Sequence, residues 1–167
     1  KQLVELTKEQ SRSGYAVGDI YMGKVKKIMP GLNAAFVNVG YEKDAFIHYL
    51  DLGPQFTTQQ KLVNILTNNK KIPNFETMRL DKAMGKNGKI SGFIASGQSI
   101  LVQIAKEAIS TKGPRLTCDM SLAGRNVVLI PFSNKVSISQ KIRSAEERKR
   151  LKRIASEVLP NNYGVII

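Results

Sequence analysis

The stretch from residue 21 to residue 50 reads YMGKVKKIMPGLNAAFVNVGYEKDAFIHYL, and it decides the fold. Three runs typical of β-strands follow one another around it, each closed by a turn signal, at residues 20–29, 32–39 and 43–50. Apolar residues alternate with polar ones along much of these runs. That period predicts an antiparallel sheet with one face in the core and the other in water.

The face expected in water carries aromatic residues beside lysines: Phe36, Phe46, Lys24, Lys26 and Lys43. Exposed rings offer flat surfaces to unpaired bases, and lysines offer positive charge to phosphates. These residues are therefore candidate contacts for a single-stranded nucleic acid. Core packing is the alternative for both phenylalanines, since aromatic residues in strands are commonly buried, and periodicity alone does not decide between the two.

The charge balance also favours a polyanion as partner. The chain has 167 residues with 26 Lys and Arg against 13 Asp and Glu, which gives a formal net charge of +13 and a pI of about 10.0. RNA or DNA is the usual partner of so basic a domain. A solvated basic surface and an anionic membrane surface are the alternatives.

Cysteine usage and hydropathy bear on location. The single cysteine, Cys118, excludes an internal disulfide and predicts a reducing compartment, the cytoplasm. We interpret it as a structural thiol. No apolar run reaches the ~18 residues of a membrane span, and no signal-peptide core opens the chain. The first residue is not Met and the last residues resemble the start of a strand, so we expect a part of a longer protein.

Two further strands complete a barrel. Residues 98–106 alternate clearly, and residues 116–122 follow as another strand. Five strands with a loop before the last two are typical of the oligonucleotide-binding (OB) fold. Residues 56–67 have helical apolar spacing. Residues 72–97, rich in glycine and lysine, are predicted to be an exposed and partly disordered excursion.

The rest of the chain predicts an α/β region outside the barrel. Residues 126–132 are nearly all apolar, which favours a strand buried on both faces, and residues 136–142 favour an edge strand. A helix over 144–159 begins with a capping-box pattern at Ser144 and Glu147. Its expected buried stripe is Leu151, Ile154, Ala155 and Val158. A strand begins at residue 165. The predicted class is β-rich α+β, with the barrel inserted between a first strand at residues 3–6 and this region.

Catalytic and metal-binding patterns are absent from the sequence. His48, the only histidine, has no Cys, His or paired carboxylate near it, so a position at the rim is expected rather than a metal ligand. No Ser/His/Asp set and no cluster of carboxylates stands out. Lys112, beside Gly113 and before a strand, is a candidate phosphate contact.

Two motif-rich stretches resemble the amino-terminal part of the bacterial ribonuclease E/G family. The first runs from G-K-V through A-A-F-V-x-V-G to A-F-I, and the second is V-Q-I-x-K-E…K-G-x-R-L-T…S-L-A-G-R. The resemblance implies an S1-type RNA-binding domain of the OB fold at residues 16–117. It also implies that this domain is inserted into a partial RNase H-like subdomain, formed by residues 1–15 and 118–167. The loop at residues 53–96 departs from the commoner family pattern by being longer, and its role is open.

The resemblance further implies roles for particular residues. Phe36, Phe46 and Lys112 match positions that engage RNA, whereas Gly124 and Val128 match part of a pocket for the five-prime monophosphate. The family's magnesium-dependent catalytic subdomain, and the cysteine pair that joins protomers through zinc into a homo-oligomer, lie outside this chain. We therefore expect single-stranded RNA binding without cleavage, within an endoribonuclease of RNA processing and decay such as rRNA processing and mRNA decay. The alternative is a free-standing, non-catalytic RNA-binding module of a ribosome- or transcription-associated factor.

Overall fold

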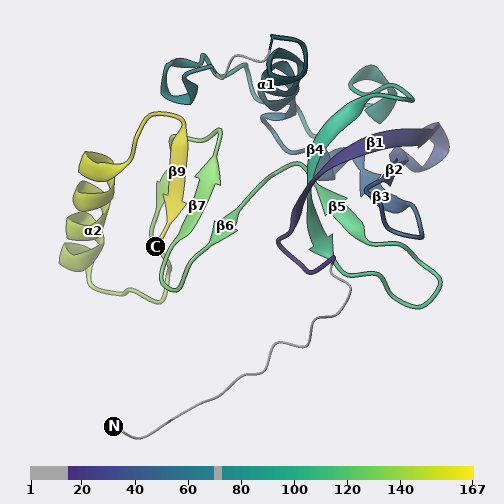
Figure 1. Cartoon of the computed structure of the whole chain (residues 1–167). Coiled ribbons are helices and arrows are strands. Elements are labelled where there is room, and N and C mark those ends of the chain that lie inside the picture. The colour runs from purple at the N-terminus through teal and green to yellow at the C-terminus, as the bar shows by residue number, and fades with distance from the viewer. Residues whose placement is uncertain (1–14, 70–72) are drawn as a thin grey trace, which may run out of the picture.

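The computed structural model describes residues 15–69 and 73–167, which form two lobes (Figure 1). The barrel lobe is a closed barrel with the strand order β1-β2-β3-β5-β4. Its strands are β1 (Ile20–Met29), β2 (Ala34–Asn38), β3 (Ala45–His48), β4 (Ser99–Lys106) and β5 (Arg115–Thr117). The β-rich α+β class with a five-stranded, OB-like barrel, predicted from the sequence, is confirmed.

Period-2 alternation builds the interior of the barrel. The apolar residues of β2 and β3 that were expected inside are fully buried, and so are the alternating residues of β4. The barrel core includes Val25, Ala35, Val37, Ala45, Ile47, Ile100, Val102, Ile104 and Leu116. All pairings are antiparallel except that of β3 with β5. Closure leaves the barrel without a free edge.

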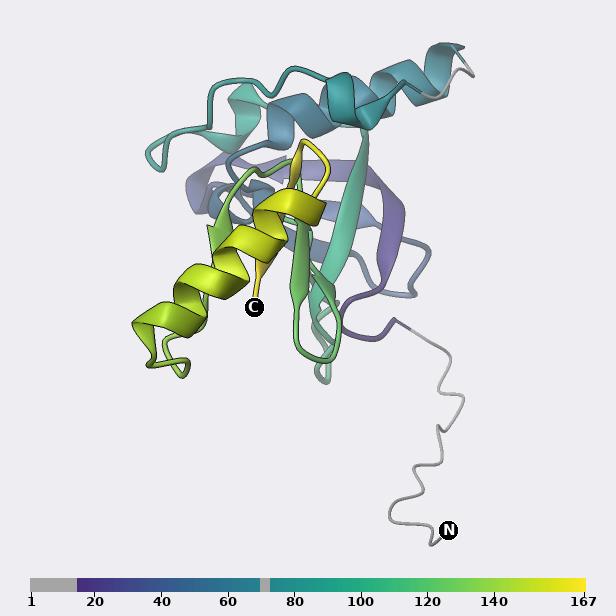
Figure 2. The same cartoon turned by 90° about the vertical axis from the view of Figure 1, so that its left-hand side faces the viewer.

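The sheet lobe is a small four-stranded sheet covered by one helix. Its order is β6-β7-β9-β8, and only β8 and β9 run parallel. The elements are β6 (Leu122–Ala123), β7 (Val128–Pro131), β8 (Val136–Ser137), α2 (Ala145–Val158) and β9 (Tyr163–Ile166). The α2 helix lies on the side of the sheet turned away from the barrel (Figures 1 and 2). The predicted helix over 144–159 is confirmed, and Ser144 caps it by accepting a hydrogen bond from the Glu147 backbone N–H (3.3 Å).

Three predictions about this lobe and the chain that leads into it are wrong in detail. The β7 strand is half-buried rather than buried on both faces, and its neighbour β6 has only two residues, both exposed. Of the expected α2 stripe, Ala155 is buried, but Ile154 and Val158 are exposed, because the helix packs chiefly on the two-residue strand β8. The run 116–122 is not one strand, since β5 ends at residue 117 and the chain then crosses to the sheet lobe.

Most of residues 73–97 are exposed, as predicted, but the segment is also anchored in the barrel core, so the prediction of a loose excursion is wrong in that respect. Residue 72, where the predicted excursion begins, lies outside the described residues. Ile90 and Ile94 are buried in the barrel core. The Asn33 side chain donates to the Gly88 carbonyl (2.9 Å) and accepts from the Ile90 N–H (2.7 Å). The Tyr49 hydroxyl donates to the Gly85 carbonyl (2.6 Å). This segment and α1 (Phe56–Asn69) cover one side of the barrel, where α1 packs on β4.

The same segment also reaches the sheet lobe. The ring of Phe75 lies 4.9 Å from that of Phe132 and 4.8 Å from that of Tyr163, measured between centroids. The buried Asn162 side chain donates to the carbonyls of Phe75 and Met78, both at 2.7 Å. Residues 73–78 thereby join the two lobes. The first strand predicted at residues 3–6 lies outside the described residues, so the division into an inserted barrel and an RNase H-like subdomain stays a prediction.

Candidate nucleic-acid interface

One row of side chains crosses neighbouring strands on the outside of the barrel. Lys27 on β1 lies opposite Phe36 on β2, and Phe36 lies opposite Phe46 on β3. Phe46 lies opposite Arg115 on β5, which in turn lies opposite Lys106 on β4. Side chains paired in this way share a face and are close enough to interact. We call these five residues the cation–aromatic row: two rings with one cation on one side and two on the other.

The two phenylalanines of the row are not core residues. Both are half-buried, whereas their strand neighbours Ala35, Ala45 and Ile47 are fully buried on the opposite face. Their ring centroids lie 6.1 Å apart at an interplanar angle of 70°, an edge-to-face pair. The pairing restricts each ring, and part of each ring surface stays open to solvent. The core-packing alternative is therefore wrong for Phe36 and Phe46.

The predicted lysines lie beside the row rather than in it. Lys26 pairs with Asp44 (Nζ–Oδ1 2.9 Å), and the Lys43 ammonium donates to the Ser110 carbonyl (2.7 Å). Lys24 is exposed and lies opposite Asn38. Sequence reasoning missed Lys27, because an irregularity in register between Val25 and Lys27 breaks strict alternation and leaves two consecutive lysines exposed.

The loop that carries Lys112 is fixed beside β3. Lys112 and Ile109 exchange backbone hydrogen bonds (2.9 and 3.2 Å), and the Phe46 N–H donates to the Pro114 carbonyl (2.8 Å). Gly113 lies against the backbone carbonyl of Asp44, where a Cβ atom would not fit. The backbone of the Lys112 loop is therefore fixed beside β3, and the Lys112 side chain is exposed. A phosphate contact by Lys112 stays a prediction.

Arg115 is held by two hydrogen bonds to Asp51 (Nε–Oδ2 3.1 Å, Nη2–Oδ1 3.0 Å). These bonds raise the pKa of the Arg115 guanidinium above its ordinary value. Asp51 also accepts from the His48 N–H (3.2 Å), while His48 Nδ1 accepts from the Leu50 N–H (3.2 Å). His48 thus caps a short turn at the rim. Sequence reasoning missed Arg115, because the β3–β5 pairing joins residues 46 and 115, which are distant in the chain.

Gly124 and Val128 lie in the sheet lobe and not in the row. They belong to the β6–β7 hairpin, where Ala123 lies opposite Val128 and the Gly124 N–H donates to the Val127 carbonyl (2.8 Å). Gly124 is exposed and Val128 is half-buried. The structure therefore brings the two predicted residues together in one hairpin, separate from the predicted stacking residues.

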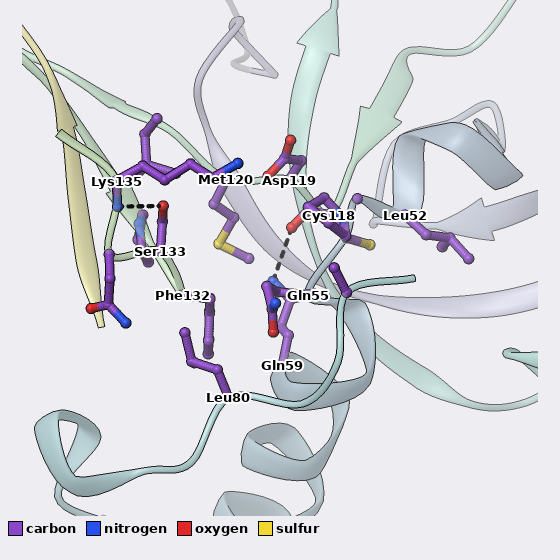
Figure 3. A pocket seen from close by; sticks show the side chains of 16 residues that line it. Leu52, Gln55, Gln59, Leu80, Cys118, Asp119, Met120, Phe132, Ser133 and Lys135 are labelled. Carbon is purple, nitrogen blue, oxygen red and sulfur yellow. Dashed lines mark hydrogen bonds between the residues drawn. The ribbon is translucent and has the colours of Figure 1, made fainter. Parts of the chain in front are cut away.

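A cavity of about 420 Å³ lies between the two lobes (Figure 3). Leu52, Met120 and Phe132 give it an apolar lining, and Asp119 and Lys135 are among its polar residues. Partial burial raises the pKa of the Asp119 carboxyl above its ordinary value. In the same wall, the Gln59 amide donates to the Cys118 carbonyl (3.2 Å) and so ties α1 to the chain leaving the barrel.

Within residues 15–69 and 73–167, no group of three or more His, Cys, Asp or Glu side chains is placed to hold a metal ion. Burial, with smaller contributions from Asp51 and Asp119, raises the pKa of the Cys118 thiol, so the thiol stays protonated at neutral pH. No helix in the described part of the chain is long and apolar enough to cross a bilayer.

The fold and the row define an OB-like barrel with a basic, aromatic outer face. Sequence comparison makes the assignment more specific: the model of the Ribonuclease E/G family matches residues 121–167. Ribonuclease E of Nostoc sp. is 37% identical over 154 residues, which cover 92% of this chain and 19% of the relative. Ribonuclease G of Escherichia coli (strain K12) is 33% identical over 170 residues, which cover 99% of this chain and 30% of the relative.

The chain therefore belongs to the ribonuclease E/G family, as its motifs predict. It spans about a fifth of the Nostoc sp. relative and less than a third of the Escherichia coli relative. The family model itself covers the sheet lobe, whereas the two relatives match nearly the whole chain and hence the barrel as well.

Proposed function

We propose that the outer face of the barrel binds single-stranded RNA as part of a ribonuclease E/G-type endoribonuclease. One observation carries the proposal: the cation–aromatic row sets Phe36 and Phe46 side by side, with Lys27 on one side and Arg115 and Lys106 on the other. Family membership supports RNA as the polyanion.

The row has the chemistry that a single strand requires. Unpaired bases stack on aromatic rings, and each stacked base contributes about 1–3 kcal/mol with little sequence preference. A duplex keeps its bases stacked inside and offers none to the rings. Lys27 on one side of the rings and Lys106 on the other attract the phosphates of a strand that runs across the barrel, whereas the charge of Arg115 is partly offset by Asp51. Additional positive charge comes from the lysines beside the row: Lys24, Lys26, Lys43 and Lys112.

We further propose that Gly124 and Val128 form part of a site for the five-prime monophosphate, as the resemblance implies. Their shared, partly exposed hairpin supports this role. The remaining residues of that site would come from the longer protein, and so would the protomer contacts that zinc mediates.

Cleavage is proposed to belong to the longer protein, acting in the cytoplasm on RNA processing and decay. Within the described residues, no three or more His, Cys, Asp or Glu side chains are grouped to hold a metal ion. RNA binding by this chain supplies substrate positioning. Family membership favours this over the alternative of a free-standing RNA-binding module.

Fluorescence anisotropy tests the binding proposal with a labelled single strand and the same strand in a duplex. We expect tighter binding of the single strand, with a log–log salt slope of about −3 if roughly 4 phosphates are neutralised. With magnesium present, the RNA should stay intact. Equal affinity for the duplex, or a binding that does not respond to salt, would contradict the proposal.

A further inference from the structure

A groove of about 510 Å³ runs between the edge strand β8 and helix α2, in the sheet lobe. Its lining is basic, and none of the described residues that line it is acidic. They are Val136, Ser137, Ile138, Arg148, Lys149 and Lys152. The helix lies on the side of the sheet turned away from the barrel, so this groove is separate from the cation–aromatic row (Figures 1 and 2).

Arg148 braces one wall of the groove. Its guanidinium donates to three backbone carbonyls that follow β8: Ile138 (3.2 Å), Ser139 (2.7 Å) and Ile142 (3.0 Å). An added peptide strand would need such carbonyls free at the sheet edge. The brace therefore disfavours an added strand that continues along the carbonyls after β8.

Lys149 and Lys152 carry the positive charge in the groove that is available to a ligand. On the same helix Arg150 pairs with Glu147 (2.7 Å), and Arg153 lies 4.0 Å from Glu157. The two lysines are exposed, and neither forms an ion pair with another described residue. Three residues apart, they lie on one side of the helix, and both line the groove.

We propose that this groove is a second contact for the phosphate backbone of RNA, in addition to the row. A polyanion suits two exposed ammonium groups in a groove without carboxylates. The inference rests on the proposed function, because it takes the strand bound at the barrel to be the one that reaches the groove. A short strand occupies the barrel alone, whereas a long strand occupies both places.

The test compares the chain with its Lys149→Ala/Lys152→Ala variant on two single strands. One strand has about 6 nucleotides, within the range that one OB fold covers, and the other has about 40. The variant should bind the short strand as the parent does. For the long strand, losing two phosphate contacts should reduce the salt slope by about 1.4. If parent and variant bind equally at about 1 M salt, the variant should bind roughly 25-fold more weakly than the parent at about 0.1 M salt.

The Lys82→Ala/Lys89→Ala variant is the matched control, since it removes the same charge from two exposed lysines outside the groove. Unchanged binding of the long strand by the Lys149/Lys152 variant, or an equal loss in the control, would overturn the proposal. A loss on both strands would also overturn it. Capture of a poly-glutamate peptide at the two lysines, with RNA binding unchanged, would assign the groove to an acidic protein instead.

Short-strand binding by the parent keeps this test separate from that of the proposed function. If the parent fails to bind the short strand but binds the long one through Lys149 and Lys152, the barrel proposal fails, and with it the idea that one strand reaches both places.

Discussion

The two lobes differ in how completely they bury their apolar residues. In the barrel, alternating residues such as Ile47, Ile100 and Leu116 are fully buried, and the closed sheet has no free edge. In the sheet lobe the strands have two to four residues, and Ile154 and Val158 on α2 stay exposed. The barrel therefore has a core of its own, whereas the sheet lobe depends more on its neighbours.

The same difference in burial predicts a difference in rigidity between the two lobes. A closed barrel fixes the backbone positions of strands β1 to β5, so the cation–aromatic row, the proposed RNA contact, is formed without a ligand. The sheet lobe is tied to the barrel lobe by residues 73–78, through the ring of Phe75 and the amide of Asn162. We expect the binding surface of the barrel to be rigid and the sheet lobe to open more readily.

The largest expected effect is on the barrel core. Leu116→Ala should cost about 2–5 kcal/mol of unfolding free energy, because a fully buried leucine leaves a cavity in a closed core. Leu129→Ala, on the half-buried β7, should cost clearly less. Urea unfolding measures both variants. Equal losses would contradict the difference between the lobes.

The connection between the lobes should show the next largest effect. Asn162→Ala removes the two hydrogen bonds to the carbonyls of Phe75 and Met78. It also places alanine at φ 67°, a backbone conformation that asparagine tolerates better. A loss of about 1–3 kcal/mol of unfolding free energy is expected. Amide hydrogen exchange should speed up in β7 and β9 and stay unchanged in β1 to β4. The exposed neighbour Asn161→Ala serves as control. Faster exchange in the barrel as well would show that the lobes unfold together.

The next prediction compares two lysines on β1, one in the row and one outside it. Lys27 lies opposite Phe36, whereas Lys24 lies opposite Asn38. Lys27→Ala should reduce the salt slope of RNA binding by about 0.7, the value for one phosphate contact on a single strand, and Lys24→Ala should reduce it less. Titrations at several salt concentrations measure this. A larger effect at Lys24 would show that RNA binds beside the row rather than along it.

The smallest expected effect is a pH dependence in the cavity between the lobes. The pKa of Asp119 is raised by partial burial, so its ionised form destabilises the fold once pH exceeds the ordinary aspartate pKa of 3.8, and the cost vanishes as pH falls through both values. Asp119→Asn should therefore gain stability relative to the parent as pH rises above that range. Thermal melts across pH measure the difference between the two proteins. A difference that does not change with pH would mean that Asp119 is solvated.

Much of the fold follows from local patterns in the sequence. The period of two gives the barrel strands and their inward residues, and the Ser144 cap gives the start of α2. The anchoring of residues 73–97 in the barrel core escaped prediction because Ile90 and Ile94 stand singly among glycines and lysines, and their burial depends on the distant partners Asn33 and Tyr49. Composition does not reveal such contacts.

The candidate site was predictable in part. The strand pattern placed Phe36 and Phe46 on one face, but could not distinguish a core face from an open one until the barrel closed. Lys27 required the irregular register of β1, and Arg115 required the parallel pairing with β3. Both depend on long-range pairing, which a local reading of the sequence does not contain.

The most direct test is an RNA titration of the Phe36→Ala/Phe46→Ala variant with a short single strand, alongside a thermal melt. Each ring should contribute about 1–3 kcal/mol of binding free energy, and the fold should lose little because both rings lie outside the core. A Phe36→Tyr/Phe46→Tyr variant keeps the stacking surface and should bind close to the parent. A folded double alanine variant that binds RNA as tightly as the parent would contradict the assignment of the barrel face as the RNA-binding surface.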